Sequence, residues 1–494
     1  MNKGAVAAGH HLTKEVALEV LRVGGNAVDA LIASYVASFV TEPCMGSPGG
    51  GAFALVSPPN QEPVLFDFFC QTPLQKRPAD EYHFIPHIVK FGAEEEVFYF
   101  GRGSTAVPGA IAGIFALHQH SGSMPIKELF QPGLKLMKEG VALTDFQRYD
   151  LDLLGDIICH DQIGKDVFQD KNGKFKNVGD KIFMPLLADY LEVLSIEGGR
   201  EFYEGYIAHE QDRIFREEGG SLSYEDFKNY KALLRPPLSV PLGTRRLYCN
   251  PLPAMGGAVM AAALDKIWSY SEKIEPGTSE YYHLFAEAFA LARDLQLNPQ
   301  KLTAWTNHQM SKKWGSTSHI SIIDKNGMAT ALTTTIGEGN GYYDPKSQII
   351  MNNMLGESAL LPGGYHSWHP NVRLSSMMNP TIVRGINGDA VSMGSGGAGR
   401  IPYVLAQVCW NYLTSSMSLR EAVNYPRMHY DGKFFQVEKT SGQLPEKLLG
   451  IPTKLWNEFN LYYGGVHAVS RNANGDTEAI GDFRREGAWG FELD

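Results

Sequence analysis

The chain has 494 residues, of which 44% are hydrophobic and 20% are charged, the composition of a globular protein with a substantial core. Its 44 basic and 54 acidic residues give a formal net charge of -10, which argues against a nucleic-acid partner because phosphate attraction needs a basic surface. The longest apolar run, residues 30–40, is too short to span a bilayer. No membrane partner is therefore predicted.

The N-terminal residues and the cysteines bear on location. Residues 1–11 hold a single Lys with no apolar run behind it, so no secretory signal is predicted. The five cysteines are few, odd in number and widely scattered. They favour reduced thiols over a disulfide framework. Together these features predict a cytoplasmic protein.

The first predicted elements are two helices and two strands. Thr13 is placed to cap a helix that stops at Gly24-Gly25. The next helix, residues 27–40, is apolar on nearly every side and is predicted to be buried. Beyond the Thr-Glu-Pro sequence at 41–43 and a glycine cluster, strands are predicted over residues 52–56 and 64–69.

From about residue 105 to residue 300 the pattern is mainly helical, with apolar residues three and four apart. No low-complexity stretch, fixed-period repeat or flexible linker interrupts it, so one interlocked unit is predicted rather than separate domains. The predicted helices cover residues 109–119, 127–140, 184–196 and 280–296.

The clearest β pattern comes late in the chain. Two β-branched runs, residues 318–323 and 329–335, flank the turn pair Asn326-Gly327 and predict a hairpin. Helices and strands in this order indicate a mixed α/β layered protein. Further strands are predicted over residues 347–351, 380–383 and 389–393, before a glycine-rich segment and a helix over 404–413.

Motifs exclude several enzyme types. The chain has no Gly-x-Ser-x-Gly elbow, no His-Glu-x-x-His, no paired Cys-x-x-Cys and no phosphate-binding loop. The adjacent His10-His11 and the pair His366 and His369 are interpreted as exposed or structural side chains. No metal and no cofactor are predicted.

One glycine motif has two interpretations. Gly394, Gly396 and Gly399 follow a predicted strand and precede a helix, as in a dinucleotide-binding turn, and Glu421 lies about twenty residues on. The strand that should carry this acid is missing, because residues 419–424 have a helical pattern. Backbone N–H groups of such a turn can instead stabilise an oxyanion, and that use fits better.

Thr317 lies at the mouth of the predicted hairpin. On composition alone it is an ordinary strand residue, since β-branching suits strands. It becomes a nucleophile only if the bond before it is cut. Its new α-amine, with a reference pKa of about 7.7–8.0, would then take the proton from its own hydroxyl group.

These residues resemble γ-glutamyltranspeptidases, whose small subunit begins at such a threonine. The resemblance spans nearly the whole chain, and its motifs fall in the family order. They are Gly24–Ala30, Gly49–Gly51, Ala106–Gly109, Thr317–Asp324 with Gly327, Thr333–Thr335, Asn352-Asn353, Leu374–Met377, Pro380–Val383, Gly394–Arg400 and Asp482–Arg485.

The resemblance implies a four-layer αββα sandwich (α/β, more fully α+β) of the N-terminal-nucleophile hydrolase type. It implies self-cleavage between Ser316 and Thr317 into pieces 1–316 and 317–494, which stay associated as one structural unit. Thr317 would then attack a small-molecule or peptide amide to form an acyl-enzyme, and water or an amine acceptor would release the acyl group. A homo-oligomer is left open.

The resemblance also assigns roles to individual residues. Thr335 supports the nucleophile by hydrogen bonding, and the backbone N–H groups of Gly397 and Ala398 form the oxyanion site. The substrate-binding positions are Ser375 and Ser376, which match the pair that holds the donor carboxylate, together with Asn353, Glu357 and Phe69.

Three positions depart from the family pattern. Phe69 stands where γ-glutamyl-specific members carry an Arg, which removes a bidentate carboxylate clamp. Gly337 replaces an Asn, and Glu357 is one methylene longer than the usual acid. Arg102, Arg373 and Arg400 are the candidates to replace the missing guanidinium.

These departures favour hydrolysis of a non-glutamyl amide over glutathione chemistry. Glutaryl, oxamate-like and β-lactam side-chain amides are the alternatives for the acyl group. An unprocessed homologue that only binds a ligand is a further alternative, and a dinucleotide-binding protein is the least favoured one.

Overall fold

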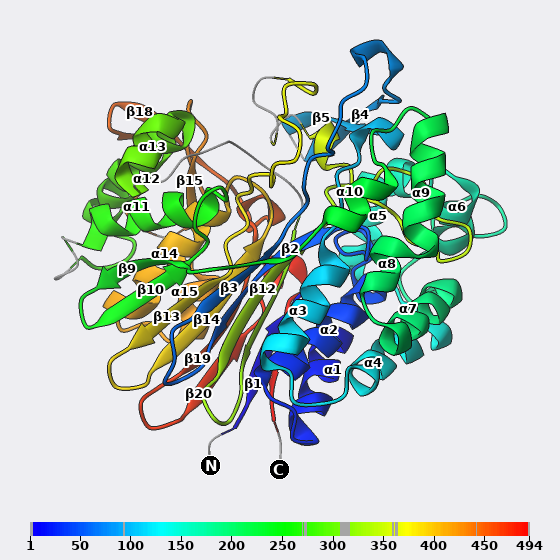
Figure 1. The fold of residues 1–494 in the computed structure, drawn as a ribbon. Coiled ribbons are helices and arrows are strands. Elements are labelled where there is room, and N and C mark those ends of the chain that lie inside the picture. The colour runs from blue at the N-terminus through cyan, green and yellow to red at the C-terminus, as the bar shows by residue number, and fades with distance from the viewer. Residues whose placement is uncertain are drawn as a thin grey trace.

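The computed structural model describes residues 3–91, 94–268, 270, 274–306, 317–357, 360, 364–440 and 442–492. Two β-sheets lie face to face, and helices cover the outer face of each sheet (Figure 1). The predicted four-layer αββα sandwich is therefore confirmed. In order across it, the seven-stranded sheet contains β21 (Ala488–Phe491), β1 (Ala5–Ala8), β11 (Ser318–Ile323), β12 (Ala329–Thr335), β2 (Gly51–Ser57), β3 (Val64–Phe68) and β8 (Leu233–Arg235). The six-stranded sheet contains, in order, β20 (Thr477–Ile480), β19 (Gly465–Arg471), β14 (Ala390–Gly396), β13 (Thr381–Gly385), β10 (Arg245–Cys249) and β9 (Leu238–Leu242).

The helices fall into two groups, one against each sheet (Figure 1). Beside the seven-stranded sheet lie α1 (His11–Arg22), α2 (Ala27–Thr41), α3 (Ala110–Ser121), α4 (Ile126–Glu139), α5 (Asp145–Ile158), α6 (Gln162–Phe168), α7 (Pro185–Glu197), α8 (Arg200–Glu204), α9 (Tyr206–Glu217) and α10 (Tyr224–Asn229). Beside the six-stranded sheet lie α11 (Gly256–Trp268), α12 (Ser279–Leu297), α13 (Pro299–Thr306), α14 (Ile401–Thr414) and α15 (Leu419–Asn424).

Smaller elements complete the fold. Four short strands form a separate sheet: β15 (Met428–Tyr430), β16 (Phe435–Val437), β17 (Lys447–Leu448) and β18 (Ile451–Leu455). Two hairpins pair β4 (Ile85–Phe91) with β5 (Glu94–Phe100), and β6 (Val141–Ala142) with β7 (Lys181–Ile182). The 3-10 turns are η1 (Ala79–Glu81), η2 (Arg102–Ser104), η3 (Met354–Gly356), η4 (Leu461–Tyr463) and η5 (Phe483–Arg485).

Side chains alternate along the strands between two apolar clusters, one on each face of the seven-stranded sheet. Ala5 and Ala7 of β1, like Phe53 and Leu55 of β2, belong to the apolar cluster between the two sheets. Their neighbours Val6, Ala8, Ala54 and Val56 belong to the cluster with the first helical layer. Because successive strand residues point to opposite faces, this pattern also tells which residues of β11 and β12 face the other sheet.

The Gly24–Ala30 motif has a structural role at the start of α2. Asn26 caps the helix and forms a capping box with Asp29, which satisfies the first backbone N–H groups. Asp29 also accepts from the backbone N–H groups of Ser123 and Met124, so the helix start is tied to the end of α3. Ala27 N–H donates to Asp324 in the turn of the late hairpin, 3.0 Å away. This motif therefore joins α2 to the strand that follows Thr317.

Several sequence predictions need correction. The cap of α1 is His10, whose ring accepts from Leu12 N, whereas Thr13 is buried inside the helix and hydrogen-bonded to Thr41. Residues 347–351 form only isolated bridges, because the segment meets single residues such as Gly49 rather than a strand. The stretch predicted as mainly helical also contains β8, β9 and β10.

Candidate active site

Four positions line up across one end of the seven-stranded sheet. Ser318 pairs with Thr334, Thr335 pairs with Gly51, and Ala52 pairs with Phe68. Continuing these registers by one residue gives a transverse row of Thr317, Thr335, Gly51 and Phe69. By strand alternation all four face the six-stranded sheet. With neighbouring strands about 4.8 Å apart, the row is roughly 14 Å long from Thr317 to Phe69.

Strand β14 crosses directly over β11. A Cβ at Gly396 would lie 2.5 Å from the Thr317 carbonyl oxygen, and one at Gly394 would lie 2.2 Å from the His319 ring. Neither position therefore accommodates a side chain. Further along, Ser392 Oγ donates to Ser321 Oγ at 3.0 Å. The glycine-rich end of β14 is thus held in contact with the backbone of Thr317.

The turn after β14 presents free backbone donors. Gly397 has φ +118°, a conformation that L side chains rarely adopt. Among the described residues, no backbone acceptor is found for the N–H groups of Gly397 and Ala398. Two adjacent N–H groups beside a hydroxyl nucleophile are the arrangement that stabilises an oxyanion.

His319 follows Thr317 on the same face and is a structural residue. Its ring nitrogens hydrogen-bond to Thr333 Oγ1 at 2.8 Å and to Ser321 Oγ at 2.9 Å. Burial lowers the pKa of His319 well below its ordinary value, so the ring is neutral. Both ring nitrogens are therefore engaged in hydrogen bonds within the sheet.

The departures at positions 337 and 357 belong together. Thr335 Oγ1 accepts from Gly337 N at 2.8 Å. A Cβ at Gly337, where φ is +65°, would lie 2.1 Å from Asn353 Oδ1 and 2.4 Å from Glu357 Oε1. The longer Glu357 thus fills the space that a side chain at position 337 would need. Both Asn353 and Glu357 are fully buried.

Ser375 and Ser376 lie across from Phe69. An antiparallel bridge joins Gln71 to Arg373, and Leu374 N donates to Cys70 O at 3.0 Å, so Phe69 falls opposite Ser375. Ser375 Oγ donates to Pro253 O at 2.7 Å, and the Ser376 carbonyl accepts from the first turn of α11. The predicted substrate positions 69, 375 and 376 are therefore brought together at the far end of the row.

The family model for gamma-glutamyltranspeptidase matches residues 13–296 and 290–491. The chain belongs to the gamma-glutamyltranspeptidase family. It is thus an enzyme of the amidohydrolase and acyltransferase type.

Two relatives and one solved structure are similar to the chain. The chain is 26% identical to the glutathione hydrolase proenzyme of Escherichia coli, over 97% of this chain and 88% of the relative. It is also 26% identical to the capsule biosynthesis protein CapD proenzyme of Bacillus anthracis, over 98% and 90% of the two chains. The cephalosporin acylase of Bacillus halodurans has the same fold, with a TM-score of 0.81 at 22% identity over 99% and 96% of the chains.

None of the three candidate arginines replaces the family Arg. Two of them are paired with acids, and the third does not lie beside Phe69. Arg373 lies beside Phe69 but is engaged by Asp67, with Nε and Oδ1 3.4 Å apart, and by the Phe69 carbonyl and Tyr230 hydroxyl oxygens. Arg102 pairs with Glu218 at 2.9 Å. Arg400 has no ion pair within the described chain and stacks on Tyr462, 4.0 Å from the ring centroid. It is the N-cap residue of α14 and lies beyond the Gly397 turn rather than beside Phe69.

The dinucleotide alternative does not fit the structure. Glu421 lies in α15, where its carboxylate accepts from Ser418 in a capping box, so no strand carries it towards the glycine turn. Among the described residues, no group of three His, Cys, Asp or Glu side chains could hold a metal ion. The described part of the chain also contains no helix long and apolar enough to cross a bilayer.

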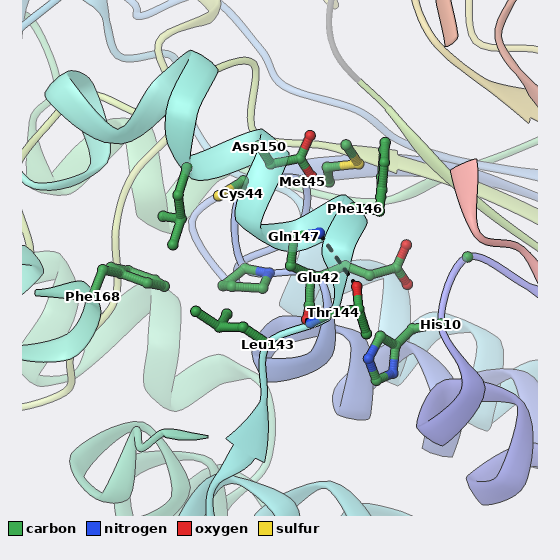
Figure 2. Close-up of a pocket in the computed structure, with 13 residues that line it drawn as sticks. His10, Glu42, Cys44, Met45, Leu143, Thr144, Phe146, Gln147, Asp150 and Phe168 are labelled. Carbon is green, nitrogen blue, oxygen red and sulfur yellow. Dashed lines mark hydrogen bonds between the residues drawn. The ribbon is translucent and has the colours of Figure 1, made fainter. Parts of the chain in front are cut away.

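Sequence reasoning missed two buried acids behind β11. Ser318 Oγ, on the helix side of the strand, donates to Glu42 Oε1 at 2.5 Å. Glu42 and Asp150 line a cavity of about 10 Å³ with His10 and Gln147 (Figure 2), roughly the space that one water molecule needs. The sequence signal was Glu42 itself, an acid directly after an apolar helix.

Burial makes these two acids hard to ionise. It raises the pKa of Glu42 from 4.5 to about 7 and that of Asp150 from 3.8 to about 8. Between pH 4 and 8 these two groups therefore bind more protons in the folded chain than in the unfolded chain, so their contribution to stability falls as the pH rises through this range.

We expect Glu42→Gln and Asp150→Asn, made in the uncut Thr317→Ala chain, to flatten this pH dependence. At pH 8 each should raise the free energy of unfolding on the order of 2 kcal/mol relative to the parent, with little change at pH 4. Urea unfolding at both pH values measures the effect, and the exposed Glu19→Gln is the control. A substitution that changes the free energy of unfolding equally at pH 4 and pH 8 would contradict the assignment.

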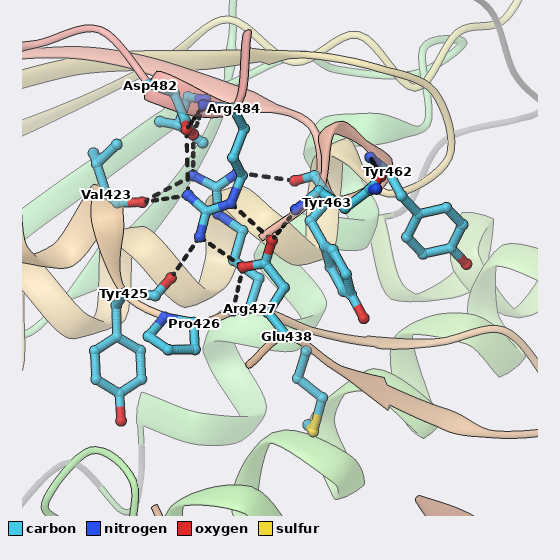
Figure 3. Close-up of polar contacts among 12 residues, drawn as sticks. Val423, Tyr425, Pro426, Arg427, Glu438, Tyr462, Tyr463, Asp482 and Arg484 are labelled. Atoms are coloured by element: carbon cyan, nitrogen blue, oxygen red, sulfur yellow. Dashed lines mark hydrogen bonds and ion pairs between the residues drawn. The ribbon is translucent and has the colours of Figure 1, made fainter. Parts of the chain in front are cut away.

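A second buried charge cluster supports the end of the six-stranded sheet. Arg484 contacts Glu438 at 2.6 Å and Asp482 at 3.2 Å, and Arg427 pairs with Asp482 (Figure 3). Asp482 also accepts from Val466 N at 2.9 Å. Burial alone would raise the pKa of Asp482, but Arg427 and Arg484 hold it at about 2. The Asp482–Arg485 motif is thus partly structural.

Proposed function

We propose that the chain cuts itself between Ser316 and Thr317, and that the released Thr317 is the nucleophile of an amide hydrolase. Ser316 lies outside the described residues. The observation that carries the proposal is the position of Thr317, at the end of β11 beside Thr335, with its carbonyl oxygen against Gly396 and the donor turn of Gly397.

The sheet pairing explains how pieces 1–316 and 317–494 would stay together. Strand β11 of the second piece pairs with β1 of the first, and β12 pairs with β2. In the other sheet, β13 of the second piece pairs with β10 of the first. Each sheet therefore contains strands from both pieces, so cutting one peptide bond would not separate them.

The reaction follows from the residues in the row. The Thr317 amine takes the proton from its own hydroxyl group, and Oγ attacks the carbonyl carbon of the amide. The N–H groups of Gly397 and Ala398 stabilise the negative oxygen, and Thr335 supports the nucleophile by hydrogen bonding. The amine product leaves with a proton, which gives an ester on Thr317. Water, or an amine acceptor, then releases the acyl group and restores the hydroxyl.

The acyl pocket argues against a γ-glutamyl donor. Phe69 is buried and stacks on Phe53, with ring centroids 5.3 Å apart, so this end of the row is apolar. The neighbouring Arg373 is already paired with Asp67. We infer that the acyl group lacks the donor carboxylate that the family Arg clamps, or holds it less tightly. Glutaryl, oxamate-like and β-lactam side-chain amides remain the candidates to compare.

A panel of anilides tests this proposal. We expect the γ-glutamyl anilide to be turned over no better than glutaryl, oxamate-like or uncharged butyryl anilides, compared as kcat/KM. Phe69→Arg should raise the ratio of γ-glutamyl to butyryl turnover roughly 10–150-fold, the range for a regained charged hydrogen bond. Phe69→Leu controls for lost volume, because it should leave the ratio unchanged. A wild-type enzyme that strongly prefers the γ-glutamyl anilide would contradict the proposed specificity.

A further inference from the structure

Cleavage before Thr317 would turn the residue that precedes β11 into a chain end. Before the cut, the chain continues from Thr317 in both directions; afterwards it continues only through Ser318. Chain ends lose order unless they are tied down. A nucleophile whose own amine acts as its base needs both atoms in fixed positions. The residues that hold Ser318 therefore control the placement of Thr317.

Ser318 is held by two contacts. Its backbone pairs with Thr334 of β12. Its side chain points to the helix layer, where Oγ donates to Glu42 Oε1 at 2.5 Å. Glu42 follows directly after α2, and its backbone N–H caps that helix by donating to Ser38 O. The exposed fractions are 8% for Glu42 and 4% for Ser318, so water does not compete for this hydrogen bond.

We propose that Glu42 is a positioning residue for the Thr317 reaction, which it serves by anchoring Ser318, the second residue of the new chain end. The inference rests on the proposed self-cleavage. Glu42 acts from the opposite face of the sheet, so it touches neither the substrate nor the reacting atoms. Ser318 links Thr317 to Glu42 through its backbone and its side chain.

The surroundings of Glu42 suit an acid that keeps its proton. Its Oε2 has no hydrogen-bond partner among the described residues, and Glu42 lines the small cavity of Figure 2. The titratable groups around it are His10 before α1, Asp150 on α5 and Arg485 on η5. A protonated carboxyl group still accepts from Ser318 through Oε1. The anchor therefore does not require the charge, only an acceptor oxygen.

The test uses Glu42→Ala, Ser318→Ala, the double variant and Glu42→Gln, which keeps an acceptor oxygen. Each full-length protein is assayed for self-cleavage on a denaturing gel, and for kcat and KM on whichever of the four anilides the wild type hydrolyses fastest. We expect Glu42→Ala and Ser318→Ala each to lower kcat or the cleavage rate about 10–100-fold with KM little changed. The double variant should be no worse than either single variant, and Glu42→Gln should retain most of the wild-type rate.

A matched control separates positioning from general stability. Tyr35 of α2 donates or accepts a similar hydrogen bond to Thr334 Oγ1 at 3.0 Å, on the strand next to Ser318. Tyr35→Phe removes that contact without loosening Ser318, so it should leave kcat unchanged. Any one of three results would overturn the inference: full kcat in folded Ser318→Ala, additive losses of kcat in the double variant, or an equal loss of kcat in Tyr35→Phe. A wild-type chain that stays uncut and inactive would instead overturn the proposed function.

Discussion

Thr317→Ala is expected to remain a single full-length chain and to lose amide hydrolysis by a factor of about 10³ or more, since no other group replaces the attacking oxygen. A denaturing gel and an anilide assay measure both effects. Thr317→Ser keeps a hydroxyl group and should cut and react more slowly than the wild type. Thr317→Ala should fold normally, because removing one hydroxyl and one methyl group at a strand end leaves the sheet pairing intact.

Ser321→Ala is the matched control for this result. Ser321 lies on the same strand and the same face as Thr317, and it bonds to His319 and Ser392. Its loss should leave cleavage complete. If wild type and Thr317→Ala were both uncut and indistinguishable in the assay, the chain would be a homologue that only binds a ligand.

The second large effect is expected at the buried charge cluster of Figure 3. Asp482→Ala leaves Arg427 and Arg484 without the carboxylate between them. Removing one partner of a buried ion pair typically costs about 3–5 kcal/mol, because the remaining charge stays buried and uncompensated. Urea unfolding of the uncut Thr317→Ala chain, with and without Asp482→Ala, measures this loss.

Arg213→Ala provides the comparison for the cluster. Arg213 pairs with Glu210 and Glu217 at 2.7 Å, but the Arg213 side chain is 54% exposed. Exposed pairs of this kind contribute about 0–1 kcal/mol. Arg213→Ala should therefore lower the free energy of unfolding several times less than Asp482→Ala does. Equal effects of the two substitutions would show that burial does not strengthen the Asp482 cluster.

Local patterns predicted the elements that carry the nucleophile. The β-branched runs around Asn326-Gly327 gave the hairpin with its observed bounds, β11 and β12. The apolar helix after Gly24-Gly25 was also correct, and it is α2, buried at every position. These elements are decided by residues close in the sequence, so their spacing is informative.

Contacts between distant segments were not predictable in the same way. The Glu42–Ser318 hydrogen bond joins residues far apart in sequence, and nothing local indicates it. Likewise, Arg373 was a candidate clamp until the structure placed it against Asp67. The strand pattern of β8 was weak because Leu233 and Leu234 are exposed. Thr13 is a residue type that often caps helices, yet the N-cap of α1 is His10.

The most direct test of the account is N-terminal sequencing of the smaller piece of purified wild-type protein, together with its intact mass. The account predicts a piece that begins Thr-Ser-His at Thr317 and ends with the C-terminus of the chain. A single uncut chain, or a piece that begins at any other residue, would contradict it.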